Sequence, residues 1–231
     1  MNTKNPIKGY LVQSAKTNKK PILFALFAIL VAGLVLVIGR ITPVFANIFS
    51  EHILREFVVD LPVKVVGLVV PFILVFKSKS HAEWHELHPD IPISKKKFAV
   101  AIYLEMFLST FVAIPVLIVI WIVAGLIDPS IVESILTTGV FALGVMFFIV
   151  WVMTALIFTL QFTKLVEIND GTTLLCVSFL AAFGLGLGLQ SLLFSTETPP
   201  MLAAVICAFI GLIMLLIGWA ITARLYQKVD L

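Results

Sequence analysis

Three histidines lie close together in the polar stretch between two long apolar segments, and histidine is the commonest metal ligand among side chains. They are His81, His85 and His88. On a helix His81 and His85 share a face, so they could present two imidazoles to one ion, with His88 as a third ligand of a metal-dependent enzyme or sensor. The solvated face of a surface helix explains the same spacing. Because the HExxH spacing is absent, we favour that interpretation and predict no metal site.

Carboxylates inside apolar runs are the second kind of residue that could do chemistry. Glu105 lies about two turns into such a run, where an ionised group costs at least about 2.5 kcal/mol on insertion scales. It could belong to a proton relay or translocation path, or it could be a structural glutamate hydrogen-bonded to a neighbouring helix. Asp60 and Lys64, one turn apart, are interpreted as a structural ion pair near the outer membrane face.

Several catalytic patterns are missing from the sequence. No glycine is placed to form the GxxxxGK[ST] phosphate cradle, so we do not expect this chain to bind ATP through that motif. The sequence also offers no Ser/His/Asp set and no paired carboxylates at a plausible membrane depth. We therefore predict that the chain is not an enzyme.

The composition defines the environment of these residues. Of 231 residues, 61% are hydrophobic and 13% are charged, and the mean hydropathy is +1.13. A water-soluble domain would not tolerate such a composition, so we predict an all-α integral membrane protein. Cys176 and Cys207 lie inside apolar runs and provide no disulfide framework.

Six apolar stretches are long enough to be membrane spans. The expected spans are 21–39, 58–76, 98–127, 131–162, 174–194 and 201–221, all within one membrane domain of residues 21–231. Residues 1–20 form a basic segment that could be an interfacial helix.

The expected third and fourth spans each have about 30 residues, or about 45 Å of helix, so they must tilt, kink or protrude from a hydrocarbon core of about 30 Å. Pro115 offers a kink in the third span, and Asp128-Pro129-Ser130 predicts the tight turn of an antiparallel hairpin. In the fifth span, Gly184 and Gly188 form a small-xxx-small pair suited to close helix packing.

The distribution of positive charge predicts the orientation. Thirteen Lys and Arg residues lie on the side that holds both chain ends and the 77–97 loop, against Arg40 and Arg55 on the other side. Cytoplasmic loops carry an excess of these residues. We therefore expect both termini and the 77–97 loop to be cytoplasmic.

The 77–97 loop has the signals of a short helix held between two spans. Ser80 followed by Glu83 predicts a capping box, and Pro89 ends the helix, which would run from His81 to His88. Trp84 and Leu87 share one face of it, and Trp84 either anchors in the headgroup layer or fills a pocket on a partner protein. Pro92 enforces an extended turn and Ser94 can cap the next span, so we expect a partner to push on this rigid segment.

This stretch resembles a pattern found in bacterial ABC-2 type transporter permeases. The resemblance is carried by Trp84, the run Ile91-Pro92-Ile93-Ser94-Lys95-Lys96-Lys97, and then Val100 and Tyr103-Leu104. The six-span layout with cytoplasmic ends also looks like that family. The chain departs from it in having Ile91 where leucine is usual and a longer basic lead before the first span.

The resemblance implies the permease half of an exporter in the bacterial cell membrane. Two permease subunits, identical or paralogous, would line a path for an amphipathic or hydrophobic cargo such as a peptide, bacteriocin, drug or lipid. Separate ABC ATPase subunits would bind ATP and Mg, and the His81 to His88 helix would be the coupling helix, with Trp84, Leu87, Pro92 and Ser94 transmitting the motion. The alternative function is a proton-coupled secondary transporter that uses Glu105.

Overall fold

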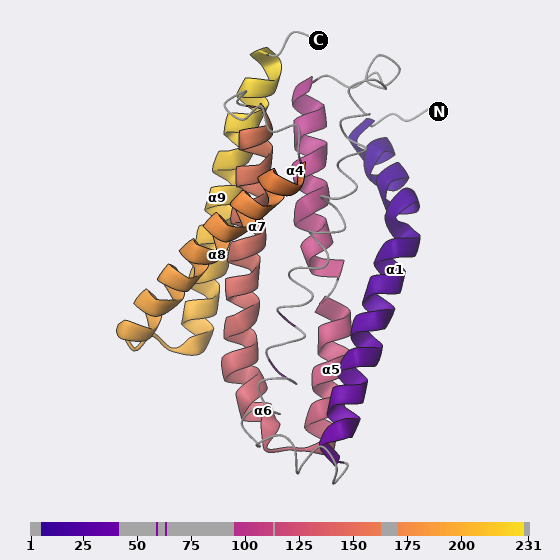
Figure 1. The fold of residues 1–231 in the computed structure, drawn as a ribbon, viewed down its shortest axis with the longest axis vertical. Helices are drawn as coiled ribbons and strands as arrows, with labels where there is room; N and C mark the ends of the chain where they lie inside the picture. Colours follow the sequence, from indigo (N-terminus) through magenta and orange to yellow (C-terminus); the bar gives the residue numbers. More distant parts are fainter. Residues whose placement is uncertain are drawn as a thin grey trace.

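The computed structural model describes residues 6–41, 59, 63, 95–112, 114–162 and 171–228, and the regular elements within these ranges are helices (Figure 1). They are α1 (Pro6–Ile41), α4 (Lys95–Val112), α5 (Ile114–Ile127), α6 (Ile131–Ser134), the π-helix η2 (Ile135–Gly139), α7 (Val140–Phe162), α8 (Gly171–Ser195) and α9 (Pro200–Lys228).

The described part of the chain contains four stretches long and apolar enough to cross a membrane. These are Ala99–Ile127, Ile131–Leu160, Cys176–Ser195 and Pro200–Leu225, and α1 adds a shorter apolar stretch, Ile22–Val35. An all-helical membrane fold is therefore confirmed for this part. The expected 58–76 span, apart from Val59 and Val63, and the expected 81–88 helix lie outside the described residues. Six spans and a coupling helix thus stay predictions.

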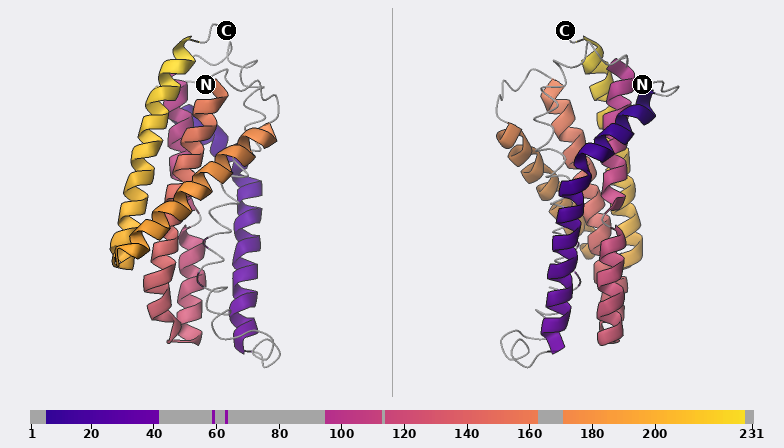
Figure 2. Two further views of the ribbon diagram at one scale, coloured as in Figure 1. Left: turned by 60° about the vertical axis from the view of Figure 1, so that its left-hand side comes forward. Right: turned by 90° about the vertical axis from the view of Figure 1, so that its right-hand side faces the viewer.

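The N-terminal basic segment and the expected first span form one helix. α1 runs without interruption from Pro6 to Ile41, and it bends between its N-terminal turns and its long apolar part (Figure 2). Pro21 lies inside this helix. Because proline has no backbone N–H to donate, it is the usual cause of such a bend.

α4 and α5 follow each other end to end along the expected third span (Figure 1), and residue 113, between them, lies outside the described residues. Pro115 is the second residue of α5, so it cannot donate a backbone hydrogen bond to the last turn of α4. The start of α1, the start of α4 and the end of α9 lie at one end of the molecule, and the turn between α5 and α6 lies at the other (Figure 1).

The turn at Asp128-Pro129-Ser130 has the expected form. The backbone N–H and the hydroxyl of Ser130 both donate to Asp128 Oδ1, at 3.0 Å and 2.6 Å. The backbone N–H of Ile131 donates to the Asp128 carbonyl at 3.1 Å. These bonds reverse the chain and place α5 beside α6 as a hairpin.

The core lies around α7, which packs most closely against α9. A Cβ on Gly144 would lie 2.5 Å from Ala204 Cα, one on Gly211 would lie 2.7 Å from Phe148 Cα, and one on Gly218 would lie 2.5 Å from Ala155 Cβ. Three glycines along one helix pair therefore allow its backbones to approach closely, as small residues do between membrane helices.

The predicted pair Gly184 and Gly188 occupies a different place. Both residues are exposed on α8, and no described atom outside the helix lies within 4 Å of a Cβ built on either one. Gly186, between them, does pack inside the chain, where its Cβ would lie 2.9 Å from Ile149 Cγ1. Close helix contact at Gly184 and Gly188 therefore stays a prediction.

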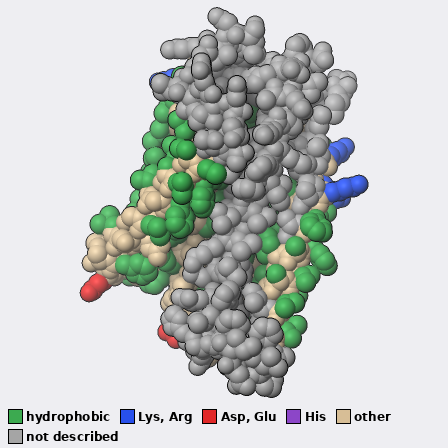
Figure 3. All heavy atoms as spheres, in the orientation of Figure 1, with side chains coloured by type: hydrophobic (Ala, Val, Ile, Leu, Met, Phe, Trp, Pro, Cys, Tyr) green, Lys and Arg blue, Asp and Glu red, His purple; other side chains and the backbone are tan. Residues whose placement is uncertain are grey.

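The outer surfaces of α8 and α9 are apolar, as expected for a protein solvated by lipid. Figure 3 shows hydrophobic side chains covering the visible face of α8. Leu180 and Phe194 on α8 and Val205 on α9 are each more than half exposed. In water this surface would aggregate, whereas in a bilayer it meets hydrocarbon.

Candidate functional site at the start of α4

Two tyrosine hydroxyls hold the first turns of α4 to other helices. The first belongs to Tyr103, which is buried on α4, and its oxygen lies 2.9 Å from Thr222 Oγ1 on α9, 119 positions along the chain. Thr222 is itself 2% exposed. Since each hydroxyl can donate or accept, the pair satisfies both polar groups in an apolar interior.

The second hydroxyl belongs to Tyr10 on α1. It donates to Glu105 Oε2 on α4 at 2.8 Å, across 95 positions of sequence. Tyr10 is 5% exposed, and its neighbours Ile7 and Leu11 pack against the same hydrophobic cluster. Burial and the adjacent Glu105 carboxylate both raise the pKa of Tyr10 above its ordinary value, so the hydroxyl keeps its proton to donate.

These two bonds lie on opposite sides of α4. Tyr103 and Glu105 are two residues apart, which is about 200° around a helix that turns 100° per residue. α9 therefore holds one side of α4 and α1 holds the other. Both hydrogen bonds therefore oppose a displacement of this part of α4 relative to α1 and α9.

Aromatic rings connect the same part of α4 to α7. The Tyr103 and Phe158 ring centroids are 5.3 Å apart, and the Phe107 and Trp151 centroids are 5.5 Å apart in a stacked arrangement. Trp151 also stacks on Phe147, with centroids 5.2 Å apart and planes 7° from parallel. These contacts bury large apolar area and add geometric preference, so α4, α7 and α9 form one packed unit.

The described residues include only some of the sequence-predicted site residues. Glu105 accepts a hydrogen bond from Tyr10 on the neighbouring α1, and its role, in a proton relay or as a structural glutamate, stays a prediction. The other predicted polar and coupling residues lie outside the described residues, namely Asp60, Lys64, His81, Trp84, His85, Leu87, His88, Pro92 and Ser94. Within the described ranges there is no group of three or more His, Cys, Asp and Glu residues that could hold a metal ion.

Sequence reasoning did not identify two members of this site, Tyr10 and Thr222. Both partners are far from α4 in the chain, and a tyrosine in a basic segment or a threonine late in an apolar span carries no local signal. Tyr103 did have a signal, since it belongs to the Tyr103-Leu104 pair of the family-like pattern. The structure gives that tyrosine a physical role as the anchor of α4 on α9.

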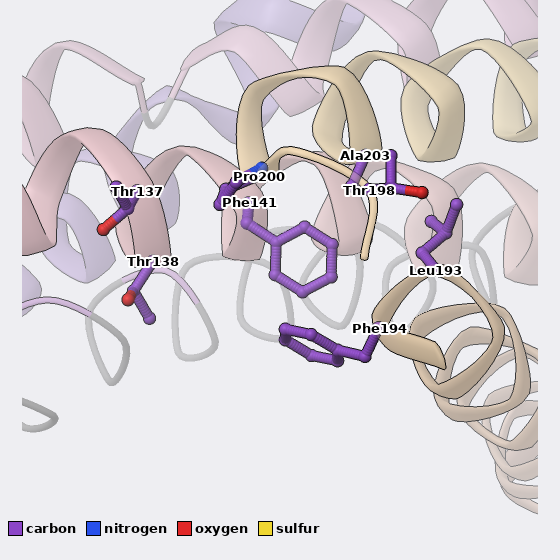
Figure 4. A pocket seen from close by; sticks show the side chains of 8 residues that line it. All are labelled: Thr137, Thr138, Phe141, Leu193, Phe194, Thr198, Pro200 and Ala203. Carbon is purple, nitrogen blue, oxygen red and sulfur yellow. The ribbon is translucent and has the colours of Figure 1, made fainter. Parts of the chain in front are cut away.

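A small recess lies near the opposite end of the helices, between the π-helix η2, the end of α8 and the start of α9. Its volume is about 80 Å³, and it is lined by Thr137, Thr138, Phe141, Leu193, Phe194, Thr198, Pro200 and Ala203. The ring centroids of Phe141 and Phe194 are 5.2 Å apart in an edge-to-face arrangement. Figure 4 shows the two rings side by side in this recess. The lining is mainly apolar and offers no acid or base for catalysis.

Comparison with protein families gives one match that covers most of the chain. The family model described as "ABC-2 family transporter protein" matches residues 19–227. The searches of curated proteins and of solved structures gave no match. The matched region includes all of α4, α5, α7 and α8 together with Tyr103, Glu105 and Thr222, whereas Tyr10 precedes it. The chain is therefore a multi-pass membrane protein that belongs to the ABC-2 transporter family.

Proposed function

We propose that this chain is the transmembrane permease subunit of an ATP-binding cassette exporter, with ATP hydrolysed on a separate ATPase subunit. The observation that carries the proposal is the family match over residues 19–227. The anchoring of α4 by Tyr103 and Glu105 supports it, because α4 directly follows the 77–97 loop on which a partner would act.

The proposed mechanism begins at the 77–97 loop. An ATPase pocket holds Trp84 and Leu87, and Pro92 and Ser94 fix the loop to the start of α4. Closure of the ATPase dimer around ATP and Mg moves this loop. The two tyrosine hydrogen bonds then transmit the movement, through Tyr103 to α9 and through Glu105 to α1.

Cargo passes along the seam between two permease subunits, which are copies of this chain or this chain and a paralogue. We propose an amphipathic or hydrophobic cargo, exported from the cytoplasm with both chain ends on the cytoplasmic side. The apolar outer faces of α8 and α9 suit a path that a hydrophobic molecule could reach from the bilayer.

The proton-coupled secondary transporter is not favoured. Family membership points to a permease that works with an ATPase. The Glu105 carboxylate accepts a hydrogen bond from Tyr10, which is the arrangement expected of a structural glutamate between two helices.

The test is reconstitution with a cognate ABC ATPase subunit. The complex should co-purify, and the permease should stimulate ATP hydrolysis. Replacing Trp84→Ala together with Leu87→Ala should abolish stimulation. Phe24→Ala with Phe27→Ala, two exposed apolar residues of α1 away from the proposed cargo path, is the matched control and should leave it intact.

Unchanged ATPase binding and stimulation in the Trp84→Ala, Leu87→Ala variant would contradict the coupling mechanism. Transport by the purified single chain in liposomes, driven by a pH gradient and lost in Glu105→Gln, would instead establish the secondary transporter.

A further inference from the structure

One face of the N-terminal part of α1 carries exposed lysines. Lys16, Lys19 and Lys20 are all exposed, and their spacing of three and four residues puts them on one face of the helix. The opposite face carries Tyr10, which is buried against α4. This part of α1 is therefore amphipathic, with a docked face and a basic face.

The lysines lie just before the apolar stretch of α1, where lipid headgroups would border a membrane helix. The apolar stretch of α1 begins at Ile22, and Lys16 precedes it by six residues, or about 9 Å of helix. Figure 3 shows basic side chains projecting from the side of the molecule beside the hydrophobic surface of α1. Lysine ammonium groups in this position meet phosphate groups of the adjacent leaflet.

We propose that Lys16, Lys19 and Lys20 form a binding surface for anionic phospholipid headgroups. We also propose that lipid bound there restrains α4 through the hydrogen bond between Tyr10 and Glu105. Charge complementarity identifies the occupant, because three cations on one face match a phosphate-rich, negatively charged surface. Lipid binding holds the N-terminal part of α1 at the membrane surface. Tyr10 precedes Lys16 by six residues on the same helix, so restraining the lysines also restrains Tyr10 and, through its hydrogen bond to Glu105, α4.

The size of the effect follows from the charge. Each lysine near an anionic membrane surface contributes about fivefold in affinity, so removal of three reduces the preference for anionic lipid on the order of a hundredfold. The attraction weakens as salt shortens the Debye length. If the N-terminal part of α1 bound lipid through apolar contacts alone, its affinity would depend neither on these lysines nor on the salt concentration.

The experiment compares the full chain in nanodiscs of phosphatidylcholine with the full chain in nanodiscs that also contain phosphatidylglycerol. Hydrogen exchange of residues 6–20 should be slower with phosphatidylglycerol, and high salt should remove the difference. Native mass spectrometry should show phosphatidylglycerol retained on the wild-type chain. The triple variant Lys16→Gln, Lys19→Gln, Lys20→Gln should lose both effects.

Lys97→Gln with Arg224→Gln is the matched control, since both are exposed cations elsewhere on the described surface, and it should keep both effects. Equal exchange in the two kinds of nanodisc, or retention of phosphatidylglycerol by the triple variant, would overturn the binding surface.

Tyr10→Phe tests the second part of the proposal. This variant should still bind phosphatidylglycerol and still protect residues 6–20, but lipid should no longer slow exchange at residues 95–105 of α4. If α4 responds to phosphatidylglycerol equally in Tyr10→Phe and in the wild type, the hydrogen bond does not convey occupancy.

Discussion

Gly144 on α7 and Ala204 on α9 bring two helix backbones into direct contact. A Cβ added to Gly144 would lie 2.5 Å from both the Cα and the carbonyl oxygen of Ala204. Neither backbone atom can move aside as the end of a flexible side chain could. This contact, with those at Gly211 and Gly218, makes α7 and α9 the most tightly joined pair among the described helices.

Gly144→Val should therefore destabilise the protein. Overpacking a close contact costs about 1 to 3 kcal/mol, because the backbones must separate. Gly184→Val is the matched control, since its Cβ would enter open space within the chain. We expect Gly144→Val to unfold at a lower temperature than the wild type in detergent, and Gly184→Val to unfold at the wild-type temperature. The measurement is the fraction of protein that still elutes as a monodisperse peak in size-exclusion chromatography after heating. Equal unfolding temperatures in the two variants would contradict this account of the α7 and α9 contact.

The Tyr103 and Thr222 hydroxyls should be energetically coupled. Tyr103→Phe and Thr222→Val each remove one partner of the 2.9 Å contact. A double-mutant cycle should give a coupling free energy of about 0.5 to 1.5 kcal/mol, as for other hydrogen bonds between membrane helices. The measurement is denaturant unfolding of the four proteins in the same micelle. If the free-energy losses of the two single variants simply add in the double variant, the two hydroxyls do not form this hydrogen bond in the folded protein.

Tyr10 should resist ionisation in the folded protein. Its ordinary pKa is 10.0, and burial together with the Glu105 carboxylate raises it. At about pH 11 the unfolded chain has released this proton while the folded chain keeps it, so stability is complete below pH 10 and falls as pH rises above that value. Tyrosinate absorbance should differ between the wild type and Tyr10→Phe only after unfolding. A difference in the folded proteins at that pH would show that the Tyr10 hydroxyl is not held by Glu105.

The turn between α5 and α6 should depend on the Asp128 side chain. Asp128→Ala removes the acceptor for the Ser130 N–H and hydroxyl, whereas Asp128→Asn keeps a carbonyl oxygen in the same position. Limited proteolysis at this exposed turn should be faster in the alanine variant and near the wild-type rate in the asparagine variant. The expected loss of stability is at most about 1 kcal/mol, since water replaces the lost bonds.

Local signals in the sequence predicted the helices well. Long apolar runs and the Asp128-Pro129-Ser130 triplet each act on the backbone where they stand, so the four long apolar stretches of the described residues and the hairpin turn followed from them. The expected 58–76 span and the kink at Pro115 stay predictions. The π-helix at Ile135–Gly139 was not predicted, because nothing in its composition distinguishes it from the α-helix that continues after it.

Contacts between distant helices were harder to predict. Gly184 and Gly188 have the small-xxx-small spacing, yet Gly144, Gly211 and Gly218 make the close contacts inside the chain. The spacing of small residues shows that another helix could approach this face closely. Which face of a helix does pack against a neighbour depends on how the two helices cross, which the local sequence does not give. For the same reason the sequence marked Glu105 as a residue in need of a partner and could not name Tyr10.

The uninterrupted course of α1 bears on how this protein should be labelled and fused. Pro6 and Ile41 belong to one continuous helix that bends after its N-terminal turns, so a bulky tag joined close to Pro6 would strain both this bend and the Tyr10 contact with α4. A fluorophore or affinity handle placed after Lys228 avoids that strain, and distances measured from it would report the bundle in its undisturbed shape.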